Sequence, residues 1–137
     1  MTPRQIQLVR STLAEAARHQ EVAALVFYRR LFELDPALRP LFKSDIQEQA
    51  KKLTDMLAAL VGMLDDTESL LSELRAMGAR HAGYGVKDAH YATVGTALLD
   101  MLAVTLGREF TPEAREAWTA LYGAVEETMK AGAHEAG

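Results

Sequence analysis

The chain of 137 residues contains no cysteine and only four prolines. The absence of thiols excludes a disulfide framework, a cysteine-ligated zinc or iron–sulfur centre, a cysteine nucleophile and a thioether-tethered cofactor. The length suits one domain, because domains cluster near about 100–150 residues. We therefore expect a single domain over residues 1–137, in which any cofactor is held without help from thiols.

Concentrated positive charge is also missing. Fifteen basic residues stand against nineteen acidic ones, which gives a net charge of −4, and no basic block occurs. Nucleic acids and anionic membranes attract clustered cations, so neither is an expected partner. The N-terminal residues MTPRQIQLVR lack a long apolar core. We therefore expect no signal peptide and no membrane span. The absence of cysteine is compatible with the cytoplasm, which is the location we expect.

Common catalytic motifs are absent too. The chain has no glycine-rich phosphate loop, no GxSxG elbow and no kinase motif. No two histidines stand four residues apart, which excludes a zinc pair on one helix face. Among the weaker histidines, His90 is expected to face outward or to cap a turn.

What the sequence does contain is helix punctuation. Thr2 and Pro3, with Gln5 three residues after Thr2, form a capping box with proline in the first turn. Similar starts are predicted at Asp35-Pro36, Ser44-Asp45, Asp66-Thr67 and Thr111-Pro112, and helix ends near Gly85 and Gly107. The tail after Lys130 is expected to be frayed.

Apolar residues between these signals recur at spacings of three and four, which is the period of a helix with one buried face. The stripes are Val22, Leu25, Tyr28, Phe32; Ile46, Gln49, Leu53, Met56, Leu60; Leu70, Leu74, Met77, His81; Tyr91, Val94, Leu98, Met101, Thr105; and Leu121, Val125, Met129. No strand-like alternation appears. We predict an all-α fold with about six long helices and one short one.

Three of these stripes carry a polar side chain at an inward position. A lone inward histidine such as His81 is more often a core residue bonded to a backbone carbonyl than a ligand. Gln49 alone suggests a surface residue or a satisfied buried amide, and Tyr28 alone suggests core aromatic surface whose hydroxyl reaches water. Each buried polar group needs a partner. Their presence on three separate helices therefore favours a shared cavity.

Four segments resemble bacterial haemoglobins, and they occur in the same order. FYRRLFELDPALRPLF is similar to the second and third helices, and SDIQEQAKKLTDML to the distal helix. GARHAGYGVKDAHYATVGTALLDML is similar to the proximal helix and its successor, and EAWTALYGAV to the last helix. The chain most resembles single-domain bacterial globins and the haem domain of flavohaemoglobins.

This resemblance implies the globin fold around a pocket for haem b. His81 resembles the proximal ligand and would be the only metal ligand from the protein. Tyr28 and Gln49 resemble the distal pair, Leu53 the apolar residue above the iron, and Phe42 the phenylalanine that packs on the porphyrin. The resemblance also assigns Met77, Val86, Val94 and Leu98 to the pocket walls, Lys52 and Arg80 to the haem propionates, and Tyr91 to the proximal side.

Two departures from the family pattern accompany these matches. Gln49 stands where vertebrate globins have histidine, which excludes ligation of iron by a second histidine at this position. The last-helix glutamate of flavohaemoglobins falls near Ala133 and is expected to be missing.

The resemblance implies tight dioxygen binding through Tyr28 and Gln49, and reaction of dioxygen with nitric oxide to give nitrate. Dioxygen, nitric oxide and other small diatomic molecules are the expected ligands. Because 137 residues leave no room for a flavin domain, an external reductase would be needed. A non-enzymatic oxygen carrier or store is the alternative function, and a haem-free helical sensor or adaptor is a third. We expect a monomer or a weak homodimer.

Overall fold

The computed structural model describes residues 1–42 and 45–136. Six long helices and two short 3-10 helices follow one another: α1 (Pro3–Ala17), α2 (Gln20–Leu34), η1 (Pro36–Leu41), α3 (Ile46–Gly62), α4 (Thr67–Gly83), α5 (Asp88–Leu106), η2 (Gly107–Glu109) and α6 (Pro112–Ala136). No strand occurs within the described residues. The predicted all-α architecture is confirmed, and η2 is a short helix that the sequence pattern did not indicate.

The helix boundaries agree with the start and stop signals. The Thr2 hydroxyl accepts from the Gln5 N–H at 3.1 Å, and the Gln5 side chain accepts from the Thr2 N–H at 3.0 Å. The Asp66 carboxylate caps α4, and its hydrogen bonds from Ser69 lower the pKa of Asp66. Gly107 ends α5 with a φ of +55°, which glycine adopts without steric cost. The start predicted at Ser44 lies outside the described residues, although Asp45 caps α3.

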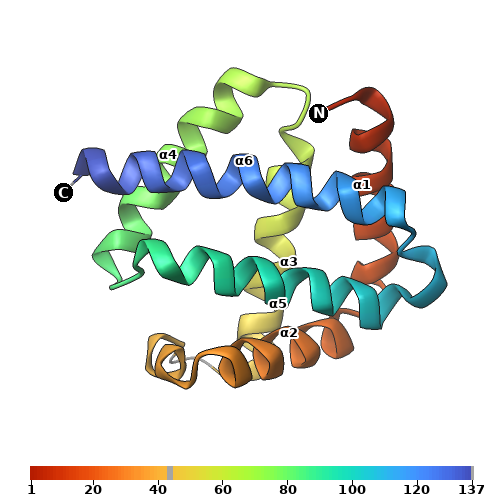
Figure 1. Cartoon of the computed structure of the whole chain (residues 1–137), viewed down its shortest axis with the longest axis horizontal. Helices are drawn as coiled ribbons and strands as arrows, with labels where there is room; N and C mark the ends of the chain where they lie inside the picture. Colours follow the sequence, from red (N-terminus) through yellow and green to blue (C-terminus); the bar gives the residue numbers. More distant parts are fainter. Residues whose placement is uncertain (43–44, 137) are drawn as a thin grey trace.

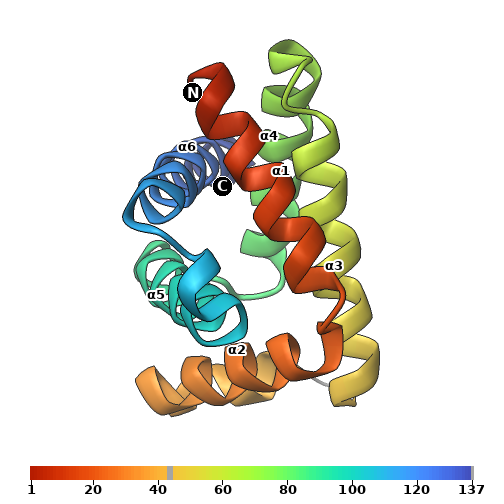
Figure 2. The same ribbon diagram turned by 90° about the vertical axis from the view of Figure 1, so that its right-hand side faces the viewer.

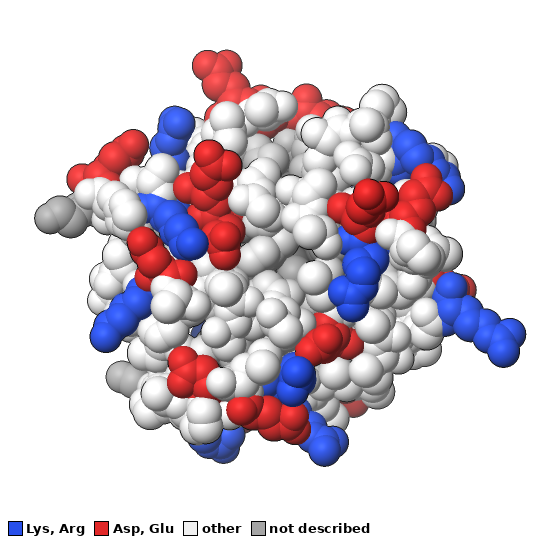
Figure 3. All heavy atoms as spheres, viewed as in Figure 1, with Lys and Arg blue, Asp and Glu red and all other residues white. Residues whose placement is uncertain are grey.

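The helices cross in two directions. Figure 1 shows α5 and α6 running side by side across one face, with α2 below them and α3 passing behind. Figure 2 shows α3 and α4 together on one side of the molecule, with α1 crossing between α6 and α3. Acidic and basic side chains alternate over the face of α5 and α6, so positive charge does not gather in one patch there (Figure 3).

The contact between α4 and α6 is unusually close because two glycines lie in it. A Cβ added to Gly78 would meet the backbone carbonyl of Met129, and one added to Gly132 would meet that of Arg75. Backbone atoms cannot move away as a flexible side chain can, so the two helices reach this separation only with glycine at both positions. The crossing fixes where α4 lies, and α4 carries His81.

The stripes predicted for α4, α5 and α6 mostly face the core. Leu74, Met101 and Met129 are buried, as are most of their stripe neighbours. The Trp118 indole N–H, also buried, donates to the Thr12 hydroxyl at 2.8 Å and joins α6 to α1. This bond satisfies a polar group that would otherwise be costly to bury.

The stripe predicted for α2 is wrong in its first half. Val22 is 53% exposed and Leu25 is 54% exposed, whereas Tyr28 is buried. The buried face of α2 consists of Ala23, Ala24, Phe27, Tyr28 and Leu31. Both sides of this helix begin with apolar residues, so periodicity alone cannot identify the inner side.

The expected fraying after Lys130 is also wrong, because α6 continues to Ala136. Gly132 packs against the backbone of α4 at Arg75. A His134 ring nitrogen lies 2.9 Å from the Asp88 carboxylate at the start of α5. These two contacts hold the last turns of the helix in place.

One described segment, 88–109, is long and apolar enough by composition to cross a membrane, with a mean hydropathy of 1.2. It consists of α5 and η2. Leu98, Met101 and Leu102 of this segment are buried against the other helices. The central helix of a protein core passes the same test of length and composition, so the finding carries little weight.

Candidate functional site

A cavity of about 450 Å³ lies among the helices and is lined mainly by apolar side chains. Helices α2 to α6 and η1 all contribute to its wall. The predicted site residues in the lining are Tyr28, Phe42, Gln49, Lys52, Leu53, Met77, His81, Val86, Tyr91, Val94 and Leu98. The structure therefore brings together every predicted site residue except Arg80.

His81 lies in the last turn of α4 and lines the cavity. Its Nδ1 is 2.7 Å from the backbone carbonyl oxygen of Met77, one turn earlier. A carbonyl can only accept, so Nδ1 carries the proton and donates, and Nε2 keeps its lone pair. A histidine that ligates a metal in a protein commonly has its other ring nitrogen anchored in this way.

Tyr28 and Gln49 contact each other on the α2–α3 side of the cavity. The Tyr28 hydroxyl lies 3.4 Å from Gln49 Oε1 and 3.3 Å from the Gln49 backbone oxygen. Burial raises the pKa of Tyr28 to about 12, so the side chain is a neutral hydrogen-bond donor near pH 7. The Phe42 ring packs edge-on against the Tyr28 ring, with the ring centres 5.3 Å apart.

Tyr91 and Tyr122 form a second polar pair in the lining. The Tyr122 hydroxyl donates to the Tyr91 backbone carbonyl at 2.6 Å. The Tyr91 hydroxyl is buried and has no hydrogen-bond partner among the described residues. Burial raises the pKa of both tyrosines, and the negative charges of Asp88 and Glu126 raise that of Tyr91 further. An orphaned donor beside a cavity is a place where a bound group can supply the missing partner.

Ala133, the position that the resemblance assigns to the last-helix glutamate, lies in α6. A different acidic residue of α6 nevertheless influences Tyr91. The negative charge of Glu126 contributes to the raised pKa of Tyr91. Glu126 also pairs with Lys130 at 3.6 Å, and the Lys130 ammonium lies 5.9 Å from the centre of the Tyr91 ring.

Arg80 is the exception among the predicted site residues. Its guanidinium pairs with the Glu73 carboxylate at 3.1 Å, both side chains are about half exposed, and Arg80 is not in the cavity lining. A long side chain on a solvent face takes a nearby opposite charge on its own helix. Lys52, the other cation expected near the cavity, does lie in its lining.

Sequence reasoning missed several lining residues. His90 caps a turn as expected, since its Nδ1 accepts from the Lys87 N–H at 2.9 Å, but it also lines the cavity and does not face outward. Tyr84 lies near His81, with the ring centres 5.9 Å apart. The remaining unpredicted residues come mostly from α3 and α6, including Leu57, Val61, Trp118, Leu121 and Val125. Leu121 and Val125 belong to the stripe predicted for the last helix, which indicated burial but not a cavity, whereas Leu57, Val61 and Trp118 lie in none of the predicted stripes.

This donor set suits one kind of metal site. No group of three or more His, Cys, Asp or Glu side chains within the described residues could hold a metal ion. One histidine in an apolar cavity does suit a metal that arrives with a large organic ring supplying its other ligands. The helical fold, the His81 nitrogen and the unpaired Tyr91 hydroxyl in one apolar cavity fit the class of helical proteins that enclose a haem.

Comparison with known sequences identifies the family. The globin family profile matches residues 25–129. Neuroglobin from Tetraodon nigroviridis is 31% identical over 140 residues, covering 92% of this chain and 88% of that protein. Neuroglobin from Dissostichus mawsoni is 32% identical with the same coverage. The chain belongs to the globin family, whose members bind haem and small diatomic ligands such as dioxygen.

Solved structures agree with this fold. An engineered carbene transferase from Rhodothermus marinus, provisionally described as a nitric oxide dioxygenase, is 27% identical with a TM-score of 0.84, covering 98% of this chain and 94% of that chain. A bacterial globin from Campylobacter jejuni is 24% identical with a TM-score of 0.83, covering 98% and 97%. A hexacoordinated heme protein from an anhydrobiotic tardigrade is 19% identical with a TM-score of 0.85, covering 98% and 96%, and supports the fold alone.

Proposed function

We propose that the protein binds haem b, with His81 as the only ligand from the protein, and that it uses the haem to bind dioxygen tightly. The observation that carries the proposal is the hydrogen bond from His81 Nδ1 to the Met77 carbonyl, which leaves Nε2 available inside an apolar cavity. When bound, haem b would supply ferrous iron, the centre at which dioxygen could bind and react with nitric oxide.

Tyr28 and Gln49 provide the selective interactions for the ligand. Dioxygen gains negative charge when it binds, so a donor aimed at it is stabilising, as in an oxyanion hole. Tyr28 is a neutral donor at neutral pH, and burial favours this form further by raising its pKa to about 12. A charge-assisted hydrogen bond contributes about 1.5–3 kcal/mol, which slows ligand release by about tenfold or more.

The apolar wall has a separate role. Phe42, Leu53, Met77 and Val94 line the same cavity as the polar pair. These side chains exclude water and limit the entry of protons to the bound ligand. Exclusion of water also strengthens the hydrogen bonds made by Tyr28 and Gln49, since the local dielectric constant is low.

The activity we propose is the conversion of nitric oxide to nitrate. One nitric oxide molecule, one dioxygen molecule and one electron give one nitrate ion, so each turnover needs an electron from outside the chain. We propose that a separate reductase supplies it. The distal pair supports this activity because it would hold dioxygen until nitric oxide arrives.

Rapid mixing of the oxygenated protein with nitric oxide tests this activity. We expect the oxygenated spectrum to convert to the ferric spectrum with formation of one nitrate per haem. Slow conversion, or none, would exclude the reaction and leave oxygen carriage or storage as the function. Slow dioxygen release together with no nitrate would favour storage over delivery.

A further inference from the structure

The outer face of α2 is apolar in the middle and oppositely charged at its two ends. Val22 and Leu25 are 53% and 54% exposed, and Val26 is partly exposed beside them. Glu21 precedes this apolar group and Arg29 follows it, and both are exposed. We call these five residues the α2 outer face. A hydrophobic group of this kind, rimmed by charges, is typical of an interaction site.

The neighbouring helix α5 extends the apolar area. Val104 is 64% exposed and lies with Val26 and Ala103 in a shallow surface groove between α2 and α5. Arg30, Glu33 and Asp100 border the groove, and Arg30 bonds Asp100 at 2.7 Å. The side of the groove nearer the start of α2 is therefore apolar, and the other side is polar.

We infer that the α2 outer face binds the same face of a second copy of this chain, with the two α2 helices antiparallel about a two-fold axis near Leu25. In such a dimer each surface must complement itself. Glu21 and Arg29 each lie four residues from Leu25, which is about 6 Å along the helix axis in opposite directions. A two-fold rotation at Leu25 therefore places Glu21 of one copy opposite Arg29 of the other, at both ends of the contact.

The present partners of these charges leave them available for this arrangement. The Glu21 side chain makes no ion pair or hydrogen bond within the described part of the chain. Arg29 pairs with Glu33 one turn away at 3.1 Å, but the Arg29 side chain is 83% exposed. Exposed pairs of this spacing are weak, so Arg29 can exchange Glu33 for Glu21 of the second copy at little cost.

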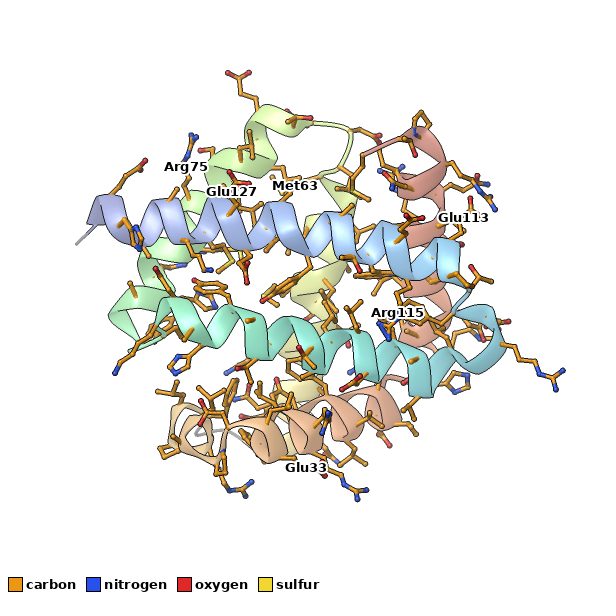
Figure 4. All side chains as sticks on the ribbon, viewed as in Figure 1. Glu33, Met63, Arg75, Glu113, Arg115 and Glu127 are labelled. Carbon is orange, nitrogen blue, oxygen red and sulfur yellow. The ribbon has the colours of Figure 1, made fainter. Side chains whose placement is uncertain are left out.

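The dimer leaves the cavity accessible. Tyr28 and Phe27 lie on the opposite, buried side of α2 and line the cavity. The proposed contact therefore does not depend on haem binding, and it can be tested whether or not the chain binds haem. Figure 4 shows Glu33 at the lower edge of α2 and Arg75 on α4, at the other edge of the molecule. A substitution at Arg75 can therefore serve as a control that lies far from α2.

Sedimentation equilibrium of the full chain tests the proposal. We expect a concentration-dependent dimer whose dissociation constant rises by about a hundredfold in Leu25→Glu, because two carboxylates then face each other at the axis. Arg75→Glu is the control, because it reverses the charge of an arginine on α4, outside the α2 outer face. We expect it to leave the dimer unchanged. Far-UV circular dichroism identifies any variant that fails to fold. A wild-type chain that is monomeric at every concentration would overturn the proposal. Binding of the monomer to lipid vesicles, without dimer formation, would overturn it too.

A charge exchange tests the antiparallel arrangement. Glu21→Arg and Arg29→Glu should each weaken the dimer by about tenfold, because like charges then face each other. The double variant should restore wild-type affinity, since the opposite charges meet again with their positions reversed. Failure of the double variant to recover would overturn the arrangement.

Cross-linking gives a second test, because the chain has no cysteine of its own. Leu25→Cys places two thiols near the axis, and we expect rapid formation of a disulfide-linked dimer under mild oxidation. Ala120→Cys, at an exposed position on α6, is the control and should cross-link slowly. Equal rates for the two variants would contradict the proposed interface.

Discussion

The Tyr28 hydroxyl lies 3.4 Å from the side-chain oxygen of Gln49, so the two polar groups of the distal side are in contact across α2 and α3. The distance is long for an O–H···O bond, and the interaction is correspondingly weak. A hydroxyl held this loosely can turn toward a ligand in the cavity at little cost. This relationship underlies the proposed tight binding of dioxygen.

Replacement of Tyr28 by phenylalanine removes the donor and keeps the ring. We expect the dioxygen dissociation rate of Tyr28→Phe to rise by about tenfold, because a charge-assisted hydrogen bond of about 1.5–3 kcal/mol is lost. Stopped-flow displacement of dioxygen by carbon monoxide measures this rate. Tyr122→Phe is the control, since the Tyr122 hydroxyl is already bonded to a backbone carbonyl. An unchanged rate in Tyr28→Phe would show that its hydroxyl does not stabilise the ligand.

Burial of Tyr28 also makes stability depend on alkaline pH. The pKa of Tyr28 is raised from 10.0 to about 12 in the folded chain, so the folded state favours the neutral phenol. The stabilisation is complete below pH 10 and is lost as the pH rises toward about 12, because the unfolded chain then releases its proton first. Urea unfolding across this range should show a smaller loss of stability in Tyr28→Phe than in wild type. Parallel curves for the two proteins would contradict the assigned pKa.

The close crossing of α4 and α6 predicts opposite effects for two Gly→Ala substitutions. Gly78→Ala should destabilise the fold by about 1–3 kcal/mol or more, since its Cβ would meet the Met129 backbone carbonyl. Gly123→Ala, in an exposed helical position with nothing within 4 Å of its Cβ, should stabilise by about 0.5–1 kcal/mol. Thermal unfolding measures both changes. A neutral Gly78→Ala would show that the two helices can separate without cost.

Much of the fold could be predicted from the sequence because most helices have one apolar side. The capping residues Thr2 and Asp66 predicted where their helices begin. The stripe that ends at His81 predicted which side of α4 faces inward. Helix α2 was harder, since Val22 and Leu25 on its outer side are as apolar as Phe27 on its inner side. Periodicity shows that a helix has faces, but the neighbouring helices decide which face is buried.

The candidate site was predictable where residues point inward from regular helices, as Tyr28 and His81 do. It was not predictable where local partners decide the position of a side chain. Arg80 turns to Glu73 on its own helix, and His90 is drawn into the cavity lining by the turn that it caps at Lys87. The extent of the cavity depends on how closely the helices cross, and this distance is set by backbone contacts that no periodic pattern encodes.

The haem proposal is tested most directly by the Soret absorbance of the full chain titrated with hemin. We predict a Soret band at one haem per chain in the wild-type protein, loss of this band in His81→Ala, and its retention in His90→Ala, a histidine that also lines the cavity. No band in the wild-type protein, or an unchanged band in His81→Ala, would contradict the assignment of His81 as the ligand.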